Sequence, residues 1–317
     1  MAFERNRWRL LDPADATLTL GLVNVLPVAL SIKHAHMRPR LPSGAYMASA
    51  PILEDKNTGA RSVFEPAALL REARRQKALP VADVPPLCVL DPDGDIVRRL
   101  RQSGQAKVSA IWPCYHTELF EFALAEKPAG IVGCAVGAPF AVLVAEELFA
   151  CGCRLLISLT SAGQIVAAGD PPYFVIIDRA LRDEGTSYHY APAESFAAAD
   201  PRIVEAAVRA VARSGLRVYA GPSWTTDAPF RETVAAVEAA RARGILAVEM
   251  EAAALYTFAR MRNAAVLCLA HVTNRMGVTE RDFEKGEADG TADALALLAA
   301  LGRALYPASP SLPGPHK

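Results

Sequence analysis

Two carboxylates lie where an apolar segment meets an alanine-rich one, in the stretch Ala247-Val-Glu-Met-Glu-Ala-Ala253. Glu249 and Glu251 are two residues apart, so in an extended chain their side chains point to the same face. Two acids on one face at the end of a strand could hold a vicinal diol, such as the 2′ and 3′ hydroxyls of a ribose. An alternative is that Glu251 only begins a helix, where its negative charge suits the helix dipole.

Two other segments present groups that could bind an anion after an apolar run. In Ser158-Leu-Thr-Ser-Ala-Gly163, the hydroxyls of Thr160 and Ser161 could donate to a phosphate or a ribose, or could only cap a turn. Gly133-Cys-Ala-Val-Gly-Ala-Pro139 joins a strand to a helix, and Gly137 permits a tight turn there. Backbone amides at the start of such a helix attract anions.

The segment Trp224-Thr-Thr-Asp-Ala-Pro-Phe-Arg231 could receive a planar base. The base would stack on Phe230, Arg231 would donate to its oxygens, and Thr226 would add a hydroxyl. Asp227 could equally be an N-cap for the helix that follows.

His271-Val-Thr-Asn-Arg275 closes another buried strand with an amide and a guanidinium. Polar residues at the carboxyl ends of strands are where α/β sheets bind ligands. Because an unpaired arginine there is costly, we expect a ligand or an acidic partner for Arg275. Asn274 is a candidate for the same site.

Apolar runs alternate with helical periodicity from residue 84 onward, which indicates a layered α/β domain. The runs are rich in β-branched residues and almost continuous, as in a sheet that is covered on both faces. The expected strands are Leu87–Leu90, Lys107–Trp112, Gly130–Val136, Leu155–Thr160, Tyr173–Ile177, Arg217–Gly221, Ile245–Val248 and Ala265–His271. The expected helices are Pro139–Ala150, Pro201–Ser214, Arg231–Arg243, Ala252–Met261 and Ala292–Leu305.

The first 84 residues have a different pattern. Thr17–Val25 and Ala45–Leu53 look like strands, Asp55–Gly59 like a turn and Pro66–Ala78 like a basic amphipathic helix. We therefore expect an N-terminal extension over residues 1–84 and a catalytic domain over 85–306. The proline-bearing tail, residues 307–317, is expected to be disordered.

Composition excludes several classes of partner. The 34 basic and 34 acidic residues cancel, so nothing indicates a nucleic acid or a membrane surface as partner. The longest apolar run, near Val23 to Ile32, is too short to cross a bilayer. The six cysteines lie mostly in apolar runs without the spacing of a zinc site. We expect them in the core of a cytoplasmic protein with no metal and no organic cofactor.

Taken together, residues 84–305 resemble the nucleoside phosphorylase/uridine phosphorylase superfamily. The matching motifs, in order, are the glycine-rich turn before Ala145-Glu-Glu-Leu148, Thr160-Ser-Ala-Gly163, Arg182-Asp-Glu-Gly-Thr-Ser187, Thr225-Thr-Asp227 and, most specifically, Val248-Glu-Met-Glu251. The resemblance implies an α/β fold with a mostly parallel mixed central sheet, partly closed and flanked by helices, after the N-terminal extension. It also implies a homo-oligomer between a dimer and a hexamer. Met250 and Glu251 would hold the ribose, with Glu249 nearby.

The reaction that the resemblance implies is cleavage of a nucleoside by phosphate, giving ribose 1-phosphate and a free base. The sugar becomes cationic at C1′ in such a step, and a carboxylate such as Glu251 favours that charge. Purine-cleaving members use an aspartate as acid where this chain has Asn274. Asn274 and Arg275 instead resemble the pair of uridine phosphorylases whose arginine helps bind uracil, which favours a pyrimidine-like base.

Departures from the family pattern keep two alternatives open. Three arginines that hold phosphate in the family correspond to Ile96, Ile157 and Thr117 here. One alternative is a nucleosidase, in which Asp93 or Asp95 positions a water molecule in place of phosphate. The other is a nucleoside-binding protein that has lost turnover.

Overall fold

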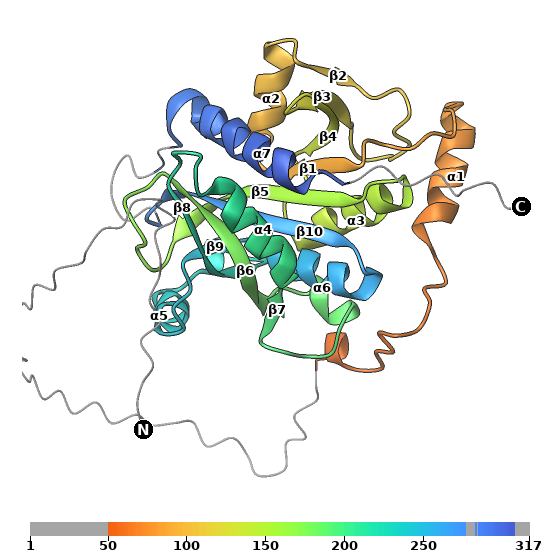
Figure 1. Cartoon of the computed structure of the whole chain (residues 1–317). Helices are drawn as coiled ribbons and strands as arrows, with labels where there is room; N and C mark the ends of the chain where they lie inside the picture. The colour runs from red at the N-terminus through yellow and green to blue at the C-terminus, as the bar shows by residue number, and fades with distance from the viewer. Residues whose placement is uncertain (1–49, 277–282, 284, 308–317) are drawn as a thin grey trace, which may run out of the picture.

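A computed structural model describes residues 50–276, 283 and 285–307, and its centre is one mixed sheet (Figure 1). Its strands are β1 (Leu87–Asp91), β2 (Ala106–Val108), β3 (Phe120–Leu124), β4 (Lys127–Gly133), β5 (Leu155–Gln164), β6 (Tyr173–Asp183), β7 (Phe196–Ala198), β8 (Val218–Thr226), β9 (Ala247–Glu249) and β10 (Ala265–Asn274). They run in the order β10-β6-β8-β9-β5-β1-β4-β3-β2, with β7 on β6. Because β10 also pairs with β5, five strands close on themselves. The longest pairings, β5 with β10 and β6 with β8, are parallel. The expected fold class is confirmed.

Helices cover both faces of this sheet. They are α1 (Pro66–Lys77), α2 (Asp95–Gln102), α3 (Ala138–Ala150), α4 (Pro201–Val211), α5 (Val234–Ala242), α6 (Ala252–Arg262) and α7 (Thr291–Leu305). Four short 3-10 helices join them: η1 (Pro51–Leu53), η2 (Thr186–His189), η3 (Pro229–Arg231) and η4 (Glu287–Gly290). The first cluster of buried apolar residues lies under α1, α3 and α6, and the second lies under α2, α4 and α7.

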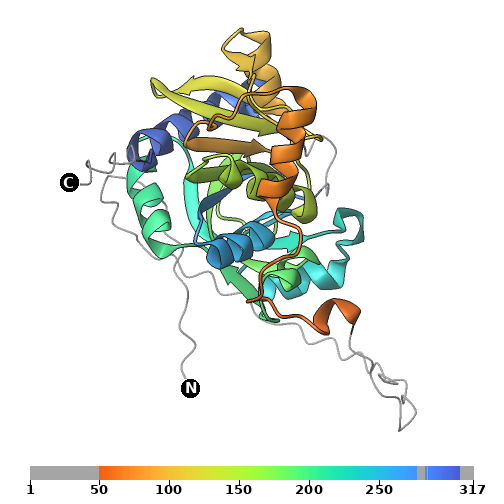
Figure 2. The same cartoon turned by 90° about the vertical axis from the view of Figure 1, so that its right-hand side faces the viewer.

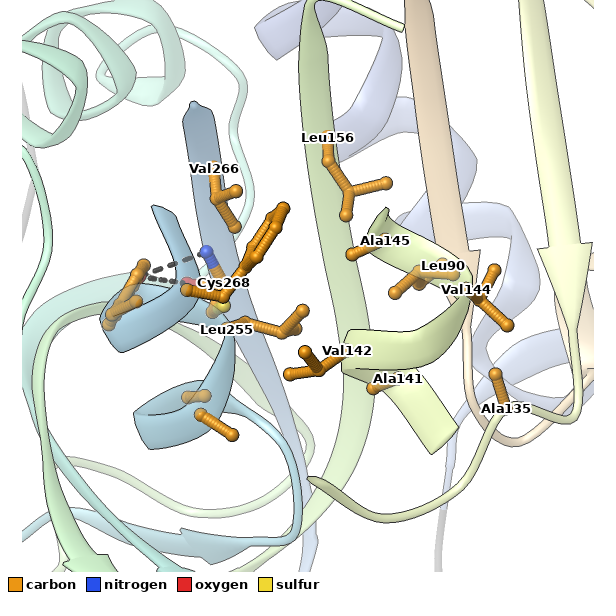
Figure 3. Close-up of a cluster of buried hydrophobic side chains, with 14 of the residues drawn as sticks. Leu90, Ala135, Ala141, Val142, Val144, Ala145, Leu156, Leu255, Val266 and Cys268 are labelled. Atoms are coloured by element: carbon orange, nitrogen blue, oxygen red, sulfur yellow. Dashed lines mark hydrogen bonds between the residues drawn. The ribbon is translucent and has the colours of Figure 1, made fainter. Parts of the chain in front are cut away.

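Strand β10 shows why the sequence folds in layers. Val266, Cys268 and Ala270 pack in the first cluster, whereas Leu267 and Leu269 pack in the second. This alternation follows from the two-residue period of a strand, and both faces are apolar because both are covered. Figure 3 shows the first cluster, where Leu255 of α6 and Val142 of α3 point toward each other beside Leu156 and Val266 of the sheet.

The described part of the extension packs on the domain. Leu70 and Ala73 of α1 are buried, and α1 lies against α3 (Figure 2). The Lys77 ammonium, near the end of α1, donates to the carbonyl of Pro113 at 2.9 Å. The strand expected at Ala45–Leu53 is wrong in its described part, because Pro51–Leu53 is a 3-10 helix that begins at a proline. The strand expected at Thr17–Val25 lies outside the described residues.

Several element boundaries differ from expectation. The segment Asp95–Gln102, for which no helix was expected, forms α2, whose Ile96, Val97 and Leu100 are buried. The short strands β3 and β7 were not expected either. Helix α5 begins at Val234 rather than Arg231, because Thr233 is its N-cap and accepts from the N–H of Ala236. Among the described residues, no helix is both long enough and apolar enough to span a bilayer.

Candidate active site

Polar residues from distant segments meet at one end of the closed strands. Strands β5 and β10 continue beyond their expected ends, so that Ser161 pairs with His271 in register. Gly163 pairs with Val248 of β9, and Thr225 of β8 pairs with Glu249. The ends of β5, β8, β9 and β10 therefore place the hydroxyl-bearing and the carboxylate-bearing motifs side by side.

Glu249 is fully engaged by its own chain. It is 3% exposed and ends β9. Its Oε1 accepts from Ser223 Oγ at 2.9 Å and from Thr225 Oγ1 at 2.5 Å. Its Oε2 accepts from the backbone N–H groups of Glu251 and Ala252, both at 2.7 Å. Four donors occupy the acceptor sites of one carboxylate. Glu249 therefore fixes the junction between β9 and α6.

Glu251 differs, because only one of its oxygens is held firmly. It is 1% exposed, and its Oε1 accepts from the N–H of Gly137 at 2.7 Å. Its Oε2 has no hydrogen-bond partner within the part of the chain that the structure describes, although the Thr160 hydroxyl lies beside the carboxyl group. Glu251 is at the N-cap position of α6, but its side chain makes no capping bond to that helix. A buried acceptor without a partner is costly, so this oxygen is available to a ligand hydroxyl.

Gly137 supplies the amide that holds Glu251. It precedes α3 with φ of 87°, a conformation that glycine adopts readily, and proline follows in the first turn. Its N–H points at the carboxyl group of Glu251, which lies 114 residues further along the chain. The glycine-rich turn therefore binds an internal carboxyl group with an amide at the start of a helix.

The pKa of Glu251 is raised to about 8. Burial is the main cause, and the negative charges of Glu249 and Asp93 add to it. The Gly137 amide and the Thr160 hydroxyl oppose the rise. The carboxyl group is therefore largely protonated at neutral pH, and a positive charge that develops beside it would favour its ionised form.

The carboxylate of Asp93 contacts the end of β5. The N–H of Ser161 donates to Asp93 Oδ2 at 2.9 Å, and the Ser161 hydroxyl donates to the same oxygen. The Lys285 ammonium lies 3.9 Å from this oxygen and also bonds to Asp95. Burial, together with the nearby Lys285 charge, lowers the pKa of His271 to about 4, so this side chain is neutral.

The residues expected to contact a base are hydrogen-bonded or ion-paired within the chain or lie exposed. Arg275 is half-exposed and forms an ion pair with Asp170 at 2.6 Å, so an acidic partner is present. The Asn274 side chain accepts from the N–H of Met276 at 2.9 Å. Met250 is half-buried beside Glu251 in the sequence. The base-contacting roles of Arg275 and Asn274 stay predictions.

In the segment after β8, Thr226 and Asp227 form hydrogen bonds, whereas Phe230 is exposed. The Thr226 hydroxyl accepts from the N–H of Ala228 at 3.2 Å, and Asp227 accepts from the N–H of Gly185 at 2.7 Å. Asp227 is therefore not the N-cap of α5. Phe230 is 99% exposed, and Arg231, also within η3, is exposed as well. Neither Phe230 nor Arg231 lines the hollows described below.

Two hollows lie near these residues, one beside α3 and the other at the end of β5. One, of about 960 Å³, lies between residues 52–69 and the helices α3 and α6, and neither Glu251 nor Thr160 lines it. The other holds only about 20 Å³ and is lined by Asp93, Thr160 and Ser161 together with His271 and Lys285. The smaller hollow is thus lined by the hydroxyl-bearing end of β5 and by Asp93, whereas Glu251 does not line it.

Lys285 is the member of this group that the sequence reasoning missed. It lies 190 residues from Asp95, its bonded partner, and no motif marks it. Asp93 and Asp95 were candidates only for a hydrolytic reaction. The density of acids in Asp91-Pro-Asp-Gly-Asp95 was the signal that a basic partner is needed.

Residues 86–303 match the family model described as Phosphorylase superfamily. A uridine phosphorylase of Thermococcus kodakarensis is 27% identical over 216 residues, which cover 58% of this chain and 77% of that protein. A guanosine phosphorylase of Halorubrum lacusprofundi is 28% identical over 135 residues, or 42% of this chain and 56% of that protein. The chain thus spans little more than half the length of the second relative.

Solved structures share the fold. A uridine phosphorylase of Vibrio fischeri ES114 superposes with a TM-score of 0.61 at 22% identity, covering 70% of this chain and 94% of that one. A purine nucleoside phosphorylase of Toxoplasma gondii in complex with immucillin-H gives 0.60 at 16% identity, covering 69% and 90%. Likeness at these identities establishes the architecture and no more.

Proposed function

The chain belongs to the phosphorylase superfamily, and on that basis we propose that it cleaves the N-glycosidic bond of a nucleoside. Phosphate is the proposed acceptor, so that the products are ribose 1-phosphate and a free base. The single observation that carries the proposal is the buried Oε2 of Glu251, which has no hydrogen-bond partner among the described residues although it lies beside the hydroxyl-bearing end of β5. Both relatives are named phosphorylases, which supports phosphate as the acceptor.

In the proposed reaction, Glu251 accepts hydrogen bonds from the ribose hydroxyls. The bond from C1′ to the base nitrogen breaks, the base leaves with the electron pair, and C1′ becomes cationic. A phosphate oxygen then forms the new bond to C1′, and the proton that hydrogen phosphate loses goes to the departing base. Ionised Glu251 stabilises the cationic sugar more than the neutral ground state, so its effect falls on the rate of bond cleavage. Gly137 and Glu249 hold the carboxyl group and its backbone in place.

A pyrimidine-like base is part of the proposal. It is supported by the uridine phosphorylase relative and by the succession of Asn274 and Arg275 at the end of β10. A homo-oligomer is also proposed, and it is supported by the fully exposed Phe230 and the exposed Val234 on one surface segment. Light scattering of the purified protein checks the assembly.

Hydrolysis is the second candidate, and the contact between Asp93 and Ser161 favours it. In that reaction a water oxygen bonds to C1′ while Asp93 takes the proton that this water loses.

One assay separates the two candidates. Release of free base from uridine, cytidine, adenosine and guanosine is followed by chromatography in sodium phosphate and in sodium chloride of equal ionic strength. Phosphorolysis requires phosphate and yields ribose 1-phosphate in equal amount with the base. Base release at the same rate in chloride, with ribose as product, supports hydrolysis. No base release from any nucleoside rejects both candidates.

A further inference from the structure

Asp93 forms the contacts that a bound oxyanion would form. One of its carboxylate oxygens accepts both the backbone N–H and the hydroxyl of Ser161, and the Lys285 ammonium lies 3.9 Å from that oxygen. An N–H, an O–H and an ammonium that converge on one point are typical of an anion site. Here the anion is a side chain of the protein itself.

The same place is beside the proposed reaction centre. Ser161 follows Thr160, whose hydroxyl lies beside the carboxyl group of Glu251, and the charge of Asp93 is felt at that carboxyl group. A nucleophile that attacks the C1′ of a ribose held by Glu251 would approach from this end of β5. The hollow there has room for about 20 Å³, so a phosphate ion does not fit while Asp93 stays on Ser161.

The negative charge around the smaller hollow also opposes the binding of a phosphate dianion. Asp95 and Asp289 line the hollow together with Asp93, and Lys285 is the only positively charged residue among the described residues that line it, because His271 is neutral. Lys285 is already bonded to Asp95. Phosphate must therefore displace a carboxylate and enter a region that carries more negative than positive charge.

We infer that Asp93 is a built-in competitor of inorganic phosphate and that it determines how readily the enzyme accepts this co-substrate. The inference rests on the proposed function. When Asp93 leaves Ser161, the N–H and the hydroxyl of Ser161 become free for a phosphate oxygen, and Lys285 stays nearby on Asp95. Removal of the carboxylate therefore improves phosphate use more than it changes nucleoside binding, because the Gly137 amide still holds Glu251.

Two substitutions at Asp93 test the inference in steps. Asp93→Asn keeps the shape and one acceptor oxygen but removes the charge, whereas Asp93→Ser is too short to reach Ser161. We expect the KM for phosphate to fall about three-fold or more in Asp93→Asn and about ten-fold or more in Asp93→Ser, because charge-assisted hydrogen bonds to the competitor are lost. The KM for the nucleoside should change less than two-fold.

Asp95→Asn is the matched control. It removes a charge of the same sign from the same loop, and Asp95 contacts Arg98 and Lys285 but has no bond to Ser161. If the effect comes from occupation of Ser161, the phosphate KM falls several-fold further in Asp93→Ser than in Asp95→Asn. Equal falls in the two variants, or no fall in either Asp93 variant, would overturn the inference.

A binding measurement separates this inference from the proposed function. The unfolding temperature of each variant is compared in sodium phosphate and in sodium chloride of equal ionic strength. Phosphate should raise the unfolding temperature of Asp93→Ser more than that of the unsubstituted protein, even if no variant releases base. If the unsubstituted protein releases base without phosphate and Asp93→Ser becomes phosphate-dependent, the inference stands and phosphorolysis is rejected for the unsubstituted protein. The absence of any phosphate effect on Asp93→Ser contradicts the inference, whatever the activity.

Discussion

Glu251→Gln is expected to change both the rate of base release and the pH dependence of stability. The carboxyl group is buried, and its pKa is raised to about 8 from the ordinary value of 4.5. The native protein therefore keeps a proton that the unfolded chain releases above about pH 4.5. Because the native state binds more protons, the free energy of unfolding falls as pH rises from about 4.5 to about 8.

The size of this fall follows from the pKa difference. Between about pH 5 and about pH 7.5 the unfolded chain is ionised at this position while the native site is not, over about 2.5 pH units. At about 1.36 kcal/mol per unit, the cost is about 3 kcal/mol. A neutral glutamine has no such cost, and its amide oxygen can still accept from the Gly137 amide.

Urea unfolding at about pH 5 and about pH 7.5 measures this difference. Relative to the unsubstituted protein, Glu251→Gln should gain about 3 kcal/mol between the two pH values. Its rate of base release should fall at least about a hundred-fold, because a neutral amide cannot stabilise the cationic sugar as a carboxylate does. Parallel pH dependence in the two proteins refutes the account of the buried proton, and an unchanged rate refutes the ribose role.

Three further variants test other parts of the structure. Glu249→Gln turns an NH2 group toward donors that now bond to a carboxylate. The free energy of unfolding should therefore fall by about 2–4 kcal/mol in urea titrations, and a change below about 0.5 kcal/mol would contradict the hydrogen bonding described for Glu249. Tyr256→Phe removes a hydroxyl that donates to the Ile177 carbonyl at 2.6 Å and should cost about 1–3 kcal/mol in the same assay, with no change in the KM for nucleoside. Arg275→Ala should change stability by less than about 1 kcal/mol, because its ion pair is exposed, but should alter the preference among bases more than the preference among sugars; equal loss for every base argues against a base contact.

The layered fold could be predicted because its signals are local. Continuous apolar runs marked β1, β5, β6 and β10, and helical periodicity marked α3 and α6, so the starts of these elements were predicted, whereas β5, β6 and β10 extend beyond their expected ends. The short strands β3 and β7 were missed because three to five residues carry too little periodicity. Helix α2 was missed because the acidic turn before it obscured its start. Closure of β10 on β5 depends on contacts far apart in the sequence, which no local pattern contains.

The candidate site could be predicted in its members but not in their roles. Glu249 and Glu251 were treated as a pair by the rule that alternate residues of a strand share a face. Strand β9 ends at Glu249, and Glu251 has ψ of −37°, so the rule does not extend to it. The first acid is surrounded by donors from β8 and from α6, while the second meets only one firm donor, Gly137. The roles of the two acids therefore differ because different hydroxyls and amides surround each carboxyl group. These neighbours come together only when the sheet is assembled, so the sequence alone does not identify them.

This difference in hydrogen bonding explains why Glu249 and Glu251, which are two residues apart, can have different roles. Glu249 lies where two strand hydroxyls and two backbone amides at the start of α6 converge, so its acceptor sites are occupied and its position is fixed. This fixed group holds the N–H of Glu251 and so sets the place of the second carboxyl group. Within the described residues, one oxygen of Glu251 is buried without a hydrogen-bond partner, which is unfavourable. Such a cost at a buried position is expected only where a ligand removes it. The free oxygen of Glu251, rather than the pair of acids, is therefore the feature from which function at this site should be tested.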